Sequence, residues 1–180
     1  MLFRYFSILL LLLSPELSSA EHTDTIPALQ IAVDITGYDK SWHLTFPNAD
    51  FNGGYYTTIT VTNTKDTIAS FAIWACSWNE SFLTNNDSLY LFSDQGCDLN
   101  SPVTIKLQPH KSIKFFGLLG SRIKNNSWQN PIAFKIGLKD MSVSDLLHFI
   151  DKKQNNLKPS VYWSDVLLLK SRLYEWEIEK

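Results

Sequence analysis

Apolar and polar residues that alternate with a period of two are the feature that most limits the folds open to this chain. The segment 55–62 reads Tyr-Tyr-Thr-Thr-Ile-Thr-Val-Thr, and every second residue of 29–35 is apolar. Successive side chains of a strand point to opposite faces of a sheet, so this period predicts half-buried β-strands. Threonine, valine and isoleucine also favour the extended backbone.

Further segments favour strands, and Asn, Asp, Gly and Pro residues separate them. The segment 71–78 is apolar on both faces, which is typical of a central strand. Short strands with such turns between them predict an all-β fold, a two-layer antiparallel sandwich. Residues 174–178 fit an edge strand, whereas 166–176 also fit a helical stripe. The other predicted strands are 88–92, 103–107, 113–118, 132–138 and 161–169.

One short helix, at about 142–153, is predicted to interrupt the strands. Positions 143, 146, 147 and 150 are apolar, which is the spacing of one helix face. Ser142 and Asp145 are placed as a capping box, and Lys152 and Lys153 favour the last turn. We expect the helix to cover one end of the core; the alternative is an inserted element that shapes a binding edge.

The segment 103–113 predicts two strands around a turn in which Pro109 sets the backbone angle. A type II turn favours glycine at the position after proline, and here His110 occupies it. We therefore predict a type I turn.

Three local features give the chain the layout of a known group of domains: an asparagine-rich strand turn, the Cys76-Ser77-Trp78 strand and the proline turn at Pro109. The layout resembles immunoglobulin-like sandwich domains and, more loosely, short exported proteins of Bacteroidetes with no assigned activity. The resemblance covers about 55–138 and the strand 161–164. It implies an immunoglobulin-like sandwich and implies no activity.

The first twenty residues have the order of a secretory signal peptide. Arg4 precedes an apolar run from Tyr5 to Leu13, and the segment ends in Ser18-Ser19-Ala20. The run is about half of the ~20 apolar residues that a spanning helix needs, so we predict cleavage and no transmembrane anchor afterwards. Residues 21–180 are then a single β-sandwich domain, exported to the periplasm or the extracellular space.

Cys76 and Cys97 are the two cysteines of the sequence. In an oxidising compartment such a pair predicts a disulfide, and two buried thiols are the alternative. The spacing suits a local staple rather than the bridge between the two sheets of an antibody domain.

Charge is polarised along the chain, although the net charge is only -2. Acids and no bases occur in 66–98, and bases and no acids occur in 99–139. One interpretation is complementary charges on neighbouring strands; the other is a basic patch for an anionic glycan, another envelope component or an acidic protein. Trp128 lies in the polar loop 125–131 and is the best candidate for an exposed anchor. The candidate binding residues are Lys106, Lys111, Lys114, Arg122, Lys124 and Trp128.

Sequence motifs of catalysis are missing, including Gly-x-Ser-x-Gly, His-Glu-x-x-His and Cys-x-x-Cys. The charged fraction of 19% argues against a nucleic-acid partner. We predict no catalytic residue, no cofactor and no metal, and a non-enzymatic binding module for a protein or glycan. The alternative is a small periplasmic hydrolase or inhibitor-like protein whose site is assembled from distant loops.

Overall fold

The computed structural model describes residues 28–46, 49–93, 100–121, 131–150 and 160–169. The predicted signal peptide, residues 1–20, lies outside these ranges, as do Arg122, Lys124, Trp128 and residues 174–178. Within them the chain is built mainly of strands, and every strand pairing is antiparallel. One α-helix accompanies them. The all-β prediction is confirmed.

The largest sheet has the order β1-β2-β7-β5 and a smaller one the order β10-β9-β4. Two further strand pairs are β3-β6 and β8-β11. The strands are β1 (Leu29–Phe46), β2 (Ala49–Asn63), β3 (Ala69–Trp74), β4 (Phe82–Thr84), β5 (Leu89–Phe92), β6 (Pro102–Leu107), β7 (Ser112–Ser121), β8 (Ile132–Phe134), β9 (Ile136–Asp140), β10 (Ser160–Trp163) and β11 (Leu167–Leu169).

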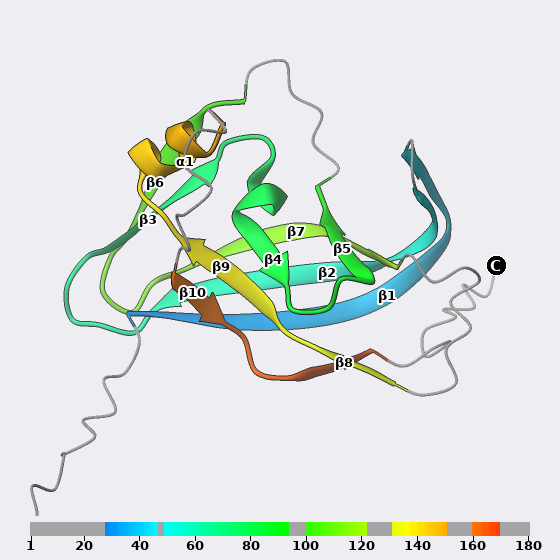
Figure 1. Ribbon diagram of the computed structural model, residues 1–180. Helices are drawn as coiled ribbons and strands as arrows, with labels where there is room; N and C mark the ends of the chain where they lie inside the picture. The colour runs from blue at the N-terminus through cyan, green and yellow to red at the C-terminus, as the bar shows by residue number, and fades with distance from the viewer. Residues whose placement is uncertain (1–27, 47–48, 94–99, 122–130, 151–159, 170–180) are drawn as a thin grey trace, which may run out of the picture.

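The core lies between the sheets in a sandwich-like arrangement. Figure 1 shows β4, β9 and β10 in front of the long, curved strands β1 and β2. The period-two pattern explains the packing, since Ile59 and Val61 of β2 are fully buried while Thr58 and Thr60 face outward. Leu138 of β9 is equally buried and belongs to the same core cluster.

Two breaks in strand structure lie side by side, one between β8 and β9 and the other between β10 and β11. Lys135 separates β8 from β9, and Ser164 follows β10. The Ile136 N–H donates to Ser164 Oγ at 3.1 Å, and the Ser164 N–H donates to Ile136 O at 2.9 Å. A side chain therefore carries the hydrogen-bond ladder across the break, which the alternation pattern did not predict.

The predicted strand 71–78 is wrong in its second half. β3 ends at Trp74, and the 3₁₀-helix η1 (Trp78–Ser81) turns the chain into β4. Trp78 is buried in the core, where its ring centroid lies 5.3 Å from that of Phe115. Gly117 gives the indole room, because a Cβ there would lie 3.0 Å from Trp78 Cη2. Burial of this large ring therefore overrides the local strand pattern.

The turn prediction is also wrong in its type. The Lys111 N–H donates to Gln108 O at 3.1 Å, which closes the expected turn around Pro109. His110 has φ of 57°, whereas a type I turn needs a negative φ there and a type II turn a positive one. β6 and β7 flank the turn but do not pair, because β6 pairs with β3 and β7 with β2 and β5.

The helix prediction is confirmed for α1 (Val143–Ile150), and residues 151–153 lie outside the described ranges. The capping box forms: the Asp145 N–H donates to Ser142 Oγ at 3.2 Å, and the Ser142 N–H donates to Asp145 Oδ2 at 2.9 Å. Leu146 packs in a small cluster with Trp74 of β3, so α1 covers one end of the molecule (Figure 1). Leu147 was expected on the apolar stripe and is exposed instead.

Candidate functional site

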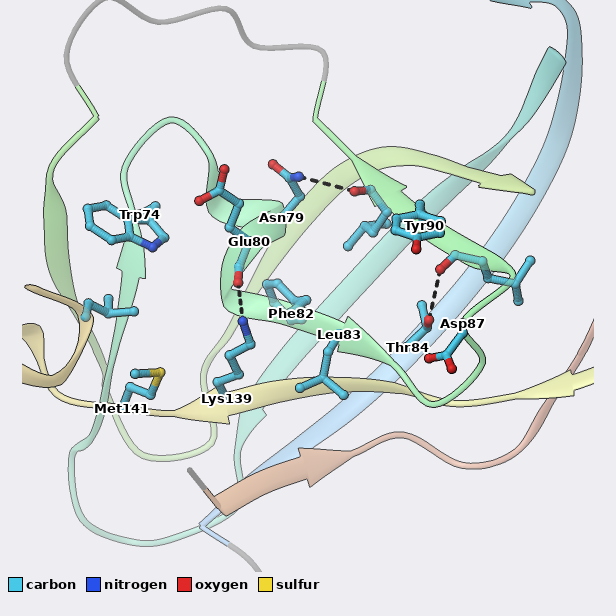
Figure 2. Close-up of a pocket in the computed structure, with 13 residues that line it drawn as sticks. Trp74, Asn79, Glu80, Phe82, Leu83, Thr84, Asp87, Tyr90, Lys139 and Met141 are labelled. Carbon is cyan, nitrogen blue, oxygen red and sulfur yellow. Dashed lines mark hydrogen bonds between the residues drawn. The ribbon is translucent and has the colours of Figure 1, made fainter. Parts of the chain in front are cut away.

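A cavity of about 520 Å³ opens where the edges of the two sheets meet. β4 is the edge strand of the smaller sheet and β5 that of the larger, and both line it together with η1, β9 and α1. Its volume lies in the usual range of small-molecule sites. The described lining residues, shown in Figure 2, are Trp74, Asn79, Glu80, Phe82, Leu83, Thr84, Asp87, Leu89, Tyr90, Leu91, Lys139, Met141 and Leu146.

Most of this wall is apolar. In Figure 2, Trp74 and Met141 lie at one end of the cavity, and Tyr90 and Asp87 lie at the other. Trp74 and Met141 are buried, whereas Leu83 and Tyr90 are half-buried and present part of their surface. The cavity therefore offers an apolar floor with an aromatic ring at its open end.

Lys139 brings a positive charge to this apolar wall. Its Nζ donates to the backbone oxygen of Glu80 at 2.8 Å, which fixes the ammonium beside η1 (Figure 2). Burial lowers the pKa of Lys139, and the nearby negative charge of Glu80 acts in the opposite direction.

Two polar side chains cover the backbone edge of β5. Asn79 Nδ2 donates to Leu91 O at 3.2 Å, and Thr84 Oγ1 donates to Leu89 O at 3.0 Å (Figure 2). These carbonyls face away from β7 and would otherwise be open acceptors on an edge strand. Since both are occupied, β5 is a poor place for an extended peptide to add as a further strand.

The carboxylates of Glu80 and Asp87 lie on the rim, and both residues are exposed. The described lining residues include no histidine, serine or cysteine, so the Ser–His and Cys–His pairs of nucleophilic catalysis do not occur among them. Nor do three or more potential metal ligands come together anywhere in the described ranges. The described lining supplies hydrogen-bond acceptors, one cationic side chain and apolar surface.

The predicted basic residues lie away from this cavity. Lys106, Lys111 and Lys114 are exposed, as expected, and none makes an ion pair with a described carboxylate. In the register, Lys106 lies opposite Ser70 and Lys114 opposite Thr60, so neither of these two lysines faces a carboxylate across the sheet. Arg122, Lys124 and Trp128 fall outside the described residues.

Cys76 lies just after β3, and no described cysteine is a free thiol. Asn100 Oδ1 accepts from the N–H groups of Cys76 and Ser77, at 3.3 Å each. Cys97, the predicted bridge partner, lies outside the described residues, so the Cys76–Cys97 disulfide stays a prediction.

A second hollow of about 370 Å³ lies on the outer face of the largest sheet. Tyr56 of β2 and Phe116 of β7 are 49% and 65% exposed there, which is unusual for such large rings. Tyr56 Oη donates to Asp39 Oδ2 at 3.0 Å. Thr36, Thr58 and Leu118 are further lining residues of this shallow groove.

Sequence reasoning missed both hollows. The cavity residues come from distant parts of the chain, from Trp74 to Leu146, and no local spacing links them. Tyr56 and Phe116 sit in predicted strands, but which face of a strand stays uncovered depends on the packing of the sheets. The aromatic content was the one available signal.

Within the described residues, no helix combines the length and the apolar character needed to cross a membrane. No protein family, curated protein or solved structure shows significant similarity to this chain.

Proposed function

We propose that the protein is an exported, non-enzymatic binding module whose cavity between β4 and β5 takes a short, uncharged glycan. The observation that carries this proposal is the combination of an apolar wall with acceptors and a donor at its rim. Glu80 and Asp87 supply carboxylate oxygens, and Lys139 supplies a positive charge. A sugar hydroxyl donates and accepts, so one polyhydroxylated ligand satisfies both kinds of group.

Charged ligands fit the cavity less well. Because Glu80, Asp87 and Lys139 supply charges of both signs, an anionic or a cationic ligand meets a repulsion as well as an attraction. A neutral glycan avoids both repulsions, and the apolar face of its rings packs against Tyr90 and Leu83. The covered edge of β5 argues against an extended peptide in the same place.

For the scaffold we propose an immunoglobulin-like sandwich of the constant type. The order β1-β2-β7-β5 corresponds to strands A, B, E and D, and β4-β9-β10 to C, F and G. The buried Trp78 next to β4 supports this assignment, because a buried tryptophan on strand C is a mark of such domains. The β3-β6 pair is additional, and the cysteines are not on B and F. The kinship with short exported Bacteroidetes proteins is part of this proposal.

Export rests on residues 1–20, and we propose that the mature chain begins at Glu21 in the periplasm or outside the cell. Once the segment is removed, the cavity faces envelope or extracellular glycans.

The test is binding of the chain 21–180 to immobilised neutral glucans, mannans and galactans, with uronic-acid polymers beside them. We expect binding to a neutral polymer and a loss of about thirtyfold in affinity for Glu80→Ala/Asp87→Ala, since each of the two lost hydrogen bonds contributes about 1 kcal/mol. Asp34→Ala is the matched control, because Asp34 is exposed on β1 outside the cavity.

Two results would contradict the proposal: no binding to any neutral polymer, or equal binding by the double variant. Release of shorter sugars from the bound polymer would favour the hydrolase alternative. Melting temperatures of all variants show that each one is folded.

A further inference from the structure

A row of aromatic rings leaves the cavity and passes onto the outer face of the largest sheet. Tyr90 lines the cavity, and its ring centroid lies 6.5 Å from that of Phe92. The ring centroid of Phe92 in turn lies 5.1 Å from that of Trp42 of β1. Tyr90 and Phe92 are two residues apart on β5 and therefore point to the same face.

The strand register extends this row to the shallow groove. Phe92 of β5 and Tyr56 of β2 both lie opposite Leu118 of β7. Because neighbouring strands are about 4.8 Å apart, the row from Phe92 to Tyr56 spans about 10 Å. Phe116 lies on the same face of β7, two residues from Leu118. Cavity and groove are thus two ends of one apolar track over the edge strand β5.

The groove resembles the cavity in its apolar character, and the charged group beside it is the Asp39 carboxylate, which accepts from the Tyr56 hydroxyl at 3.0 Å. Its described lining consists of rings, aliphatic groups, backbone and threonines, with no Asp, Glu, Lys or Arg. Tyr56 and Phe116 are exposed large side chains, and Thr36 and Thr58 line the same groove. Exposed rings with neighbouring hydroxyls offer packing for sugar rings and hydrogen bonds for their hydroxyls.

We infer that the ligand is a polymeric glycan that runs from the cavity past Tyr90 and Phe92 to the groove at Tyr56 and Phe116. The inference rests on the proposed function and adds the ligand class, a chain longer than the cavity holds. A short sugar fills the cavity alone. A longer one gains the groove in addition, so affinity rises with chain length.

The experiment measures affinity by calorimetry for glucan, mannan and galactan oligomers from disaccharide to decasaccharide. We expect the wild-type affinity to rise at least about tenfold along the series that binds, because each added ring contact contributes on the order of 1 kcal/mol. Tyr56→Ala/Phe116→Ala should remove this rise and leave the affinity for the shortest oligomers unchanged. Glu80→Ala/Asp87→Ala should weaken binding at every length.

The matched control is Val166→Ala/Leu168→Ala, which removes two equally exposed apolar side chains that do not line the groove. Phe116→Thr, which keeps the strand preference, serves as a second variant if the double one is unstable. Wild-type affinity that is independent of length, or an unchanged rise in both groove variants, overturns the inference while the short-chain binding of the proposed function stands. No binding at any length overturns both. If the wild type is a dimer and Phe116→Thr is a monomer, this face binds a second copy of the chain. That result overturns the inference of a polymer track.

Discussion

At the scale of single residues, Asn63 is a buried polar side chain that joins several segments of the chain. It ends β2 and is fully buried. Its Nδ2 donates to Thr67 O at 2.7 Å and to Leu107 O and Gln108 O at 3.1 Å each. Its Oδ1 accepts from the Lys65 N–H at 2.9 Å. One amide therefore joins the end of β2, the turn before β3 and the end of β6.

We predict that Asn63→Asp lowers the free energy of unfolding by roughly 3 kcal/mol or more, because a carboxylate cannot donate to the carbonyls of Thr67, Leu107 and Gln108 and is itself costly to bury. Protonation partly relieves this cost, so the loss should shrink as the pH falls toward 4. Urea unfolding at several pH values measures it. Gln30→Glu makes the same chemical change at an exposed site on β1 and should stay within about 0.5 kcal/mol. A similar result for both variants would contradict the role of Asn63.

His110 is a residue whose backbone conformation was predicted wrongly from the sequence. A non-glycine residue with positive φ is uncommon, and local contacts must hold it. His110 Nε2 lies 2.8 Å from Asp66 Oδ1, and both side chains are largely exposed. The carbonyl of Lys111 accepts from the Asn63 N–H at 3.0 Å, which anchors the turn from its other side. The tertiary contact of the next residue therefore outweighs the local preference of histidine.

At the scale of elements, a covalent link at the end of β3 would constrain the segments that line the cavity. The Ala75 N–H donates to Ser101 O at 2.9 Å, so the chain after β3 runs beside the chain before β6. Cys97 is three residues from Asn100, whose side chain accepts from the Cys76 N–H. The predicted Cys76–Cys97 bridge would close the loop that contains η1, β4 and β5, the elements that line most of the cavity.

We predict that Cys76→Ser/Cys97→Ser lowers the melting temperature by several degrees without abolishing the fold, since closing a loop of this length contributes roughly 3 kcal/mol in the chain-entropy model. Reduction of the wild type should give the same loss and should leave the double variant unchanged. Thiol titration of the unreduced, denatured protein should find no free thiol. Two thiols per chain would exclude the bridge.

At the scale of the whole molecule, the free energy of unfolding at alkaline pH depends on how completely the core buries its tyrosine side chains. Tyr55 is 2% exposed and packs against Tyr38 with ring centroids 4.7 Å apart. Burial, with a smaller contribution from the charge of Tyr38, raises the pKa of Tyr55 to about 12. The folded state therefore holds this proton more tightly than the unfolded chain, whose tyrosines titrate near 10.

The sign of the pH effect follows from this difference. The stabilisation is fully present below pH 10 and is lost as the pH rises through 10 to 12, by roughly 2 kcal/mol. Tyr55→Phe should flatten the fall in the free energy of unfolding over this window, as measured by urea unfolding. Tyr56→Phe should flatten it less, because Tyr56 is exposed and its pKa is raised by a hydrogen bond to Asp39. Equal pH dependence of Tyr55→Phe and the wild type would contradict the assignment.

Local patterns determined much of the architecture. The alternation in 55–62 fixed which side of β2 faces the core, since a period of two leaves one apolar face. Ser142 and Asp145 marked the start of α1, because their reciprocal bonds need only residues three apart. Pro109 marked the turn between β6 and β7. These features depend on neighbours in the sequence, and so the sequence alone was sufficient.

Tertiary structure decided the features that depend on distant partners. The core position of Trp78 ended β3 early, and Gly117, far along the chain, made room for it. The cavity formed because two edge strands from different sheets came together, and the ring row formed because the register aligned Tyr56, Leu118 and Phe92. Such contacts are set by the order and pairing of whole strands, a property that no short window of residues contains.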